Sequence, residues 1–206
     1  MHYSPYKVAE NFRLLESLFP NRIDLGLGRA PGSDAYQAGA LAYGSKTTGP
    51  EFFATKMNDL KSFLEGRPSS TKSFESVNVT PGLGEIPEVW LLVSSRQGAE
   101  YAAHFGLPMS LAYFIDPSCA DLADLYRDNF QPSVFADRPK VSIGVFSVCA
   151  DTDKEAEELS MSAAVWRYNS QKGDFGPFPT FEEAKDSISG DSVSYTHLRA
   201  HETNSH

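Results

Sequence analysis

Arg29 and the segment 94–98 are the parts of this chain whose residue types and positions could bind an anion. Arg29 follows the alternating run 22–28, which predicts a β-strand. Ser94 and Ser95 follow the apolar run 89–93 and precede a helical pattern, so two hydroxyls lie beside the free N–H groups of a helix start. A guanidinium matches phosphate oxygens with a planar fork. If both strands end on the same side of a sheet, Arg29, Ser94, Ser95 and the backbone near Gly98 could hold one phosphate.

Each of these residues also has a simpler interpretation. An arginine at a strand end is often a surface ion-pair partner, and a serine before a helix is often only its N-cap. Tyr113, near the end of a later predicted strand, could face a ligand or pack in the core. His104 lies on a predicted helix, and we interpret it as structural or solvated.

The end of the chain carries a second candidate, for metal binding. His197 and His201 are four residues apart and Glu202 follows, which resembles a metal-binding helix. The glutamate does not follow the first histidine, as it does in zinc proteases. Moreover, residues 193–203 are identical to the translation of a transposon-based sequencing-library adapter. We therefore interpret 193–206 as translated adapter, outside the native protein, and expect no metal site.

Composition and charge limit the partners. The formal net charge is −9 at pH 7, which argues against nucleic acid and anionic membranes, since both require basic surface. The chain has only two cysteines and no apolar stretch long enough to span a bilayer. These features predict a cytoplasmic protein.

Apolar periodicity predicts alternating helices and strands. Strands are expected at 22–29, 89–93, 107–114 and 141–149, with a short one near 77–79 in the long connection 66–87. Helices are expected at 5–19, 51–64, 97–105, 119–129, 153–168 and 180–187. The first helix should bury Val8, Phe12, Leu15 and Phe19, and the second Phe53, Met57, Leu60 and Leu64. The continuous apolar run 89–93 is typical of a strand buried on both faces.

This alternation indicates an α/β protein with a parallel sheet and right-handed crossovers. A closed (β/α)8 barrel needs eight strands and about 250 residues. The four expected strands are too few for a closed barrel, so we expect either a small open sheet or part of a barrel.

Several stretches together resemble one known family. Residues 2–16, 22–32 and 88–95, extended by 106–108 and 148–153, are similar to the bacterial luciferase-like flavin monooxygenases, particularly their single-chain bacterial oxidoreductase branch. The resemblance implies a partial (β/α)8 TIM-type barrel over residues 1–192, with the four strands corresponding to strands four to seven of eight. The chain would then be an internal fragment of its parent.

The resemblance also implies a cofactor and a reaction. Reduced FMN, supplied by a separate flavin reductase, would bind at the C-terminal ends of the strands and react with O2 to oxygenate a small organic substrate. Arg29, Ser94, Ser95 and Gly98 would bind its phosphate, and the catalytic residues would lie upstream of this fragment. The resemblance is compatible with a homodimer of the parent.

Two positions near the phosphate residues depart from the family pattern. Val93 stands where the family usually has glycine, and Gly98 where it usually has a small hydroxyl residue. We therefore expect the valine to crowd the turn, and Gly98 to offer only its backbone N–H.

Two alternatives remain beside the FMN monooxygenase. One is a deazaflavin-dependent reductase or dehydrogenase of the same superfamily, which would share the phosphate site but use no O2. The other is a non-catalytic flavin-binding fragment. We expect residues 1–192 alone to show no oxygenase turnover.

Overall fold

The computed structural model describes residues 3–29, 35–43, 49–81, 84–174 and 176–190. The chain divides into two compact units, residues 1–145 and 146–206. The interpretation of residues 193–206 as translated adapter, with its histidines, lies outside the described residues.

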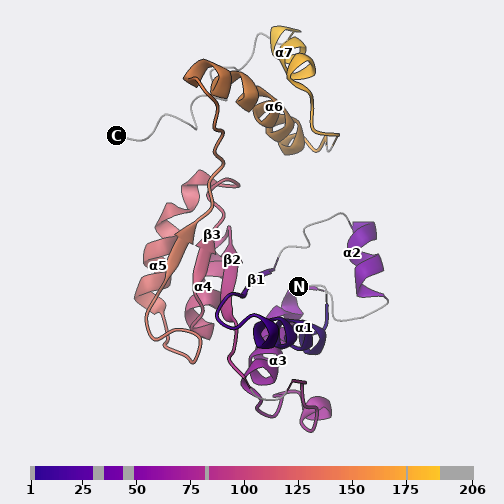
Figure 1. Cartoon of the computed structure of the whole chain (residues 1–206), viewed down its shortest axis with the longest axis vertical. Helices are drawn as coiled ribbons and strands as arrows, with labels where there is room; N and C mark the ends of the chain where they lie inside the picture. Colours follow the sequence, from indigo (N-terminus) through magenta and orange to yellow (C-terminus); the bar gives the residue numbers. More distant parts are fainter. Residues whose placement is uncertain (1–2, 30–34, 44–48, 82–83, 175, 191–206) are drawn as a thin grey trace. The chain divides into compact units, whose positions relative to one another are not determined.

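The first unit is built on a four-stranded parallel sheet with the strand order β1-β2-β3-β4 (Figure 1). The strands are β1 (Asp24–Gly28), β2 (Glu88–Val93), β3 (Met109–Leu111) and β4 (Val141–Ile143). Neighbours in sequence are neighbours in the sheet, and all strands run in one direction. The predicted parallel α/β class is thereby confirmed. The same order occurs in β/α barrels.

The last two strands are shorter than expected. The predictions 107–114 and 141–149 reduce to three residues each, because the chain turns out of the sheet soon after Leu111. The N–H of Ala112 still bonds to the Val93 carbonyl, but the N–H of Ile115 already closes a turn onto Ala112. Apolar composition alone does not show where such a turn begins.

The two faces of the sheet differ in burial. Helices cover the side on which these residues are buried: Leu25, Leu27, Val89, Leu91, Val93, Met109 and Leu111. The alternate positions of β2 are less protected, and the Leu92 side chain is 50% exposed within the described residues. The expectation that β2 is buried on both faces is therefore wrong for this structure. Alternation of side chains along a strand places Leu92 on the uncovered face.

Four helices stabilise the covered side in two pairs. Helix α1 (Pro5–Leu18) packs against α3 (Phe53–Glu65), and α4 (Arg96–Phe105) packs against α5 (Leu122–Asn129) (Figure 1). The predicted apolar face of the second helix is confirmed, since Phe53, Met57, Leu60 and Leu64 are all buried. Helix α4 ends at Gly106, whose φ of +64° is the left-handed conformation that favours glycine.

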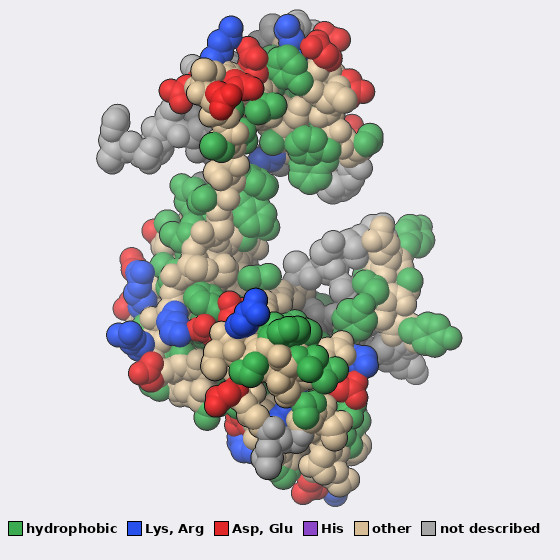
Figure 2. Space-filling model, viewed as in Figure 1, with side chains coloured by type: hydrophobic (Ala, Val, Ile, Leu, Met, Phe, Trp, Pro, Cys, Tyr) green, Lys and Arg blue, Asp and Glu red, His purple; other side chains and the backbone are tan. Residues whose placement is uncertain are grey.

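The predicted face of the first helix is confirmed only in part: Val8 and Phe12 are partly buried against the core, but Leu15 and Phe19 are exposed. Helix α1 buries Pro5, Ala9, Arg13 and Glu16. Leu15 and Phe19 are instead 37% and 46% exposed, and hydrophobic side chains lie among charged ones on the visible surface of this unit (Figure 2). A contact over a long sequence distance accompanies this burial: Arg13 donates to the carbonyls of Phe63 and Leu64 at the end of α3, at 3.2 and 2.9 Å. The last carbonyls of a helix lack partners in a following turn, so the buried Arg13 side chain satisfies acceptors at the end of α3 beside the Gly66 N–H, and it links α1 to α3.

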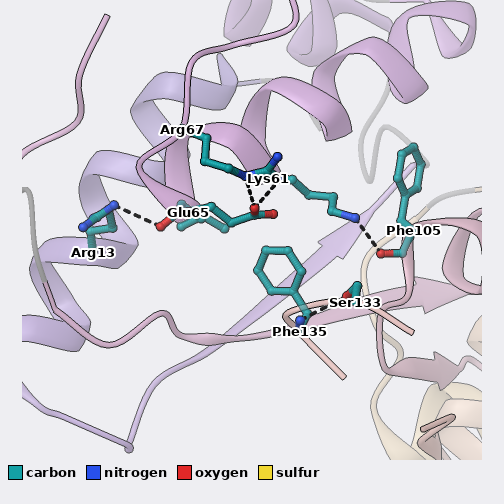
Figure 3. Close-up of polar contacts among 8 residues, drawn as sticks. Arg13, Lys61, Glu65, Arg67, Phe105, Ser133 and Phe135 are labelled. Carbon is teal, nitrogen blue, oxygen red and sulfur yellow. Dashed lines mark hydrogen bonds and ion pairs between the residues drawn. The ribbon is translucent and has the colours of Figure 1, made fainter. Parts of the chain in front are cut away.

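Lys61 joins α3 to the end of α4. Its ammonium donates to the Phe105 carbonyl at 2.8 Å and lies 5.6 Å from the ring centres of Phe105 and Phe135 (Figure 3). Burial lowers the pKa of Lys61 from its ordinary value.

The connection after α3 contains no strand in its described residues, so the strand expected near 77–79 is wrong. It holds instead the one-turn helix η2 (Lys72–Phe74). The connection is attached to α3 through Asp59, a buried carboxylate that accepts from Ser69, Ser70 and Thr71.

The remaining helices complete both units. Two one-turn helices, η1 (Pro50–Phe52) and η3 (Pro117–Asp121), precede α3 and α5, and α2 (Ala35–Ala42) was not predicted. In the second unit α6 (Asp153–Gln171) packs against α7 (Phe181–Gly190). Among the helices described here, none is long and apolar enough to cross a membrane.

Candidate functional site

The predicted phosphate residues meet where β1 and β2 end. Parallel pairing places Gly28 beside Leu92, so the chain leaves both strands at the same edge of the sheet. Arg29 follows β1 directly, and Ser94 and Ser95 lead from β2 into α4. The sheet therefore brings together residues that are 66 positions apart.

Arg29 is held by two side chains of this turn. Its Nη2 donates to Ser95 Oγ at 3.3 Å, and its Nη1 donates to the Gln97 side-chain oxygen. Both acceptors are neutral. An arginine has five N–H donors, so three remain after these two bonds.

Ser95 caps the start of α4, as the sequence predicts. Its hydroxyl oxygen accepts from the N–H of Gly98 at 3.3 Å and from Arg29. A hydroxyl has two acceptor lone pairs and one donor. Because both lone pairs are engaged, the O–H proton of Ser95 is left to donate to a ligand.

Gly98 makes room for Val93. A Cβ atom at position 98 would lie 3.1 Å from Val93 Cγ1 and 3.4 Å from Val93 Cγ2, closer than most real Cβ contacts. The Val93 side chain therefore does not crowd the turn, because Gly98 has no side chain in the space that it occupies. Helix α4 still begins with a capped first turn. The two departures from the family pattern form one size-matched pair.

A double-mutant cycle tests this pairing. Gly98→Ala should lower the free energy of unfolding by about 1–2 kcal/mol through overpacking, and Val93→Ala should relieve this cost by about 1 kcal/mol. Urea unfolding of the four proteins measures the coupling. Gly28→Ala is the matched control, because a Cβ there meets no atom within 4 Å and its effect should add to that of Val93→Ala. Additive effects of Gly98→Ala and Val93→Ala would contradict the pairing.

The other predicted ligands are placed less directly. Ser94 is exposed beside Ser95, and the N–H of Gly98 donates to Ser95. Contact of either residue with a phosphate stays a prediction. Gln97 was not predicted as a site residue. Its position in the first turn of α4 is the only sequence signal that could have indicated it.

Among the described residues, the other titratable candidates make no hydrogen bond or ion pair with Arg29, Ser95 or Gln97, although Tyr113 follows Ala112, whose N–H bonds to the Val93 carbonyl at the same edge of the sheet. Tyr113 is half-buried and packs against the hydrophobic core, and the exposed His104 ring lies edge-on to Phe105. Burial raises the pKa of Cys119 and of Tyr126, which bonds the Leu107 carbonyl. Within the described part of the chain, no group of three or more histidine, cysteine or acidic residues could hold a metal ion.

Comparison with known proteins agrees with this fold. The family model for luciferase-like monooxygenases matches residues 1–202. The chain therefore belongs to the luciferase-like monooxygenase family, as the resemblance of its sequence stretches predicts.

Individual relatives give the extent of the match. The chain is 39% identical over 184 residues to the uncharacterized protein YceB of Bacillus subtilis, covering 89% of this chain and 55% of the relative. It is 36% identical over 180 residues to a luciferase-like monooxygenase of Escherichia coli K12, covering 86% and 52%. The crystal structure of apo-MsnO8 superposes with a TM-score of 0.76 at 32% identity, covering 91% of this chain and 54% of that one. The chain thus spans about half the length of the curated relatives it matches.

Proposed function

We propose that this chain carries the phosphate-binding part of an FMN-dependent monooxygenase, which oxidises a small organic molecule with O2 and takes reduced FMN from a separate flavin reductase. Membership of the luciferase-like monooxygenase family supports flavin-dependent oxygenation as the class of reaction. A cytoplasmic location and a homodimer of the parent are part of the same proposal.

One observation carries the assignment to a phosphate. In the described structure the three bonds of the Arg29–Ser95–Gln97 turn use one donor and one acceptor each, and Arg29 still has more donors than these bonds use. The donors left over in the described residues are three N–H groups of Arg29, the Ser95 hydroxyl and the N–H groups of Arg96 and Gln97, because the N–H groups of Gly98 and Ala99 already donate to Ser95. The charge of Arg29 is bonded here to neutral oxygens. A cluster of donors around a cation suits a phosphate group.

The residues present therefore fit the phosphate of FMN. When bound, reduced flavin supplies the electrons for reaction with O2. The contribution of this chain is to hold the phosphate at one end and so fix where the cofactor lies. Ser94 and Gly98 complete the proposed set of ligands beside Arg29 and Ser95, and the Gly98 N–H, which donates to Ser95 here, would be shared with the phosphate.

A comparison of two flavins tests the proposal. The 206-residue chain should bind FMN about 200-fold more tightly than riboflavin, because only FMN offers a phosphate and two hydrogen bonds to charged groups, at about 1.5 kcal/mol each, contribute about 3 kcal/mol. Quenching of flavin fluorescence measures both constants. Raising the salt concentration should weaken FMN binding and leave riboflavin binding unchanged. Equal affinity for the two flavins would refute the phosphate site.

The same titration separates the alternatives. Tighter binding of a deazaflavin cofactor than of FMN would replace the monooxygenase by a deazaflavin-dependent oxidoreductase. We also propose that this chain binds flavin without oxygenating a substrate, since it spans only about half the length of the curated relatives it matches. Oxygen consumption with reduced FMN and an aldehyde, above the rate of free flavin, would contradict this.

A further inference from the structure

The side chain of Gln97 has a specific relation to Arg29. Its carbonyl oxygen accepts from Arg29 Nη1, while Ser95 accepts from Nη2 of the same guanidinium. Arg29 is thereby held at both terminal nitrogens by residues from the start of α4. A long arginine side chain loses rotamer freedom when it binds a ligand, so a guanidinium already held in place binds at lower entropic cost.

The other side chains in the first turn of α4 do not take this part. Arg96 points to Glu100, with Nε 3.0 Å from the carboxylate. Position 98 has no side chain, and Val93 occupies the space that one would need. Among residues 96–98, Gln97 is thus the one whose side chain reaches Arg29, beside the N-cap residue Ser95.

The chemical nature of Gln97 matters as well as its position. An amide oxygen accepts the Arg29 hydrogen bond without carrying a charge. A carboxylate at the same place would also hold the guanidinium, but it would neutralise the charge and repel an anion. The neutral amide positions Arg29 and leaves its charge available.

We propose that Gln97 is a positioning residue of the phosphate site, which holds the Arg29 guanidinium in the orientation that receives the anion. The inference depends on the proposed function, because it assigns a partner to Arg29 within that site. It predicts that substitutions at position 97 change the preference for FMN over riboflavin without changing the stability of the fold.

The test uses the 206-residue chain with three substitutions: Gln97→Ala, Gln97→Glu and, as matched control, Arg96→Ala. The readout is the ratio of the riboflavin to the FMN dissociation constant, from fluorescence quenching. Gln97→Ala should lower the ratio about fivefold, and Gln97→Glu should abolish the preference for FMN. Arg96→Ala should change it by less than about twofold, because its guanidinium already pairs with Glu100. Because residue 97 is exposed, all three melting temperatures should stay within about 2 °C of the original.

The relative FMN affinities of the two Gln97 variants distinguish a positioning role from a merely structural link to Arg29. A merely structural link to Arg29 would survive in Gln97→Glu, which would then bind FMN at least as well as Gln97→Ala. That result would overturn the inference, as would an equal loss in Arg96→Ala. Unchanged selectivity in both Gln97 variants would overturn it while leaving the phosphate site in place. If the original chain does not prefer FMN to riboflavin, the proposed function fails, and the inference fails with it.

Discussion

Replacing Arg29 by alanine is expected to weaken FMN binding about 100-fold and to leave riboflavin binding within about twofold. In the proposed phosphate site Arg29 would contribute the charge and the three N–H donors that remain after its bonds to Ser95 and Gln97. Two charge-assisted hydrogen bonds to phosphate account for a loss of about 3 kcal/mol. Fluorescence titration of both flavins measures the effect.

Two further variants make this prediction specific. Arg29→Lys keeps the charge but loses the planar fork, so we expect an intermediate loss of about tenfold. Arg22→Ala is the control. It removes an exposed arginine that precedes β1, at the opposite end of that strand, where its guanidinium lies over the Phe19 ring. Equal losses in Arg22→Ala and Arg29→Ala would show a general charge effect and contradict the site.

Replacing Asp59 by alanine is expected to lower the free energy of unfolding by about 3–4 kcal/mol. The Asp59 side chain is buried on α3 and accepts from the Ser69 hydroxyl at 2.6 Å and the Thr71 hydroxyl at 2.8 Å. It also accepts from the Ser70 hydroxyl and the Thr71 N–H, at 3.2 and 3.3 Å. Alanine would leave the buried Ser69 hydroxyl without this acceptor and would release the connection that leads to β2.

Urea unfolding measures this loss. Asp59→Asn keeps the volume and one oxygen but turns an amide toward hydroxyl donors, so its cost should be smaller, about 2 kcal/mol. Asp128→Ala, at an exposed position of α5, is the matched control and should change stability by less than about 0.5 kcal/mol. A cost for Asp59→Ala no larger than that of the control would show that the carboxylate does not anchor the connection.

Helix starts and ends were predicted well, because they depend on residues close to them in the sequence. Ser4 and Thr152 cap α1 and α6 through their own side chains, and Gly106 ends α4 with a positive φ. These features depend on residues within one turn of the helix boundary. The lengths of β3 and β4 were overestimated because an apolar segment stays apolar after it leaves the sheet.

Only part of the candidate site could be predicted, because only some of its features are visible in the local sequence. Arg29 and Ser95 could be chosen from the sequence, because a strand end and a helix start are visible in it. Gln97 could not, because its link to Arg29 spans 68 positions and depends on the pairing of β1 with β2.

The sequence by itself determined the α/β class, the order of the elements, the family and the strand edge that carries Arg29. Periodicity, capping residues and motif order are properties of the chain, so they need no tertiary contact. Tertiary structure decided which residues of α1 are buried, among them Arg13, which donates to carbonyls at the end of α3. It also decided that the Val93 side chain occupies the space that a side chain at position 98 would need. It also joined Arg29 to Gln97. These three features depend on contacts between groups that are distant in the sequence, and such contacts form only through packing and strand pairing.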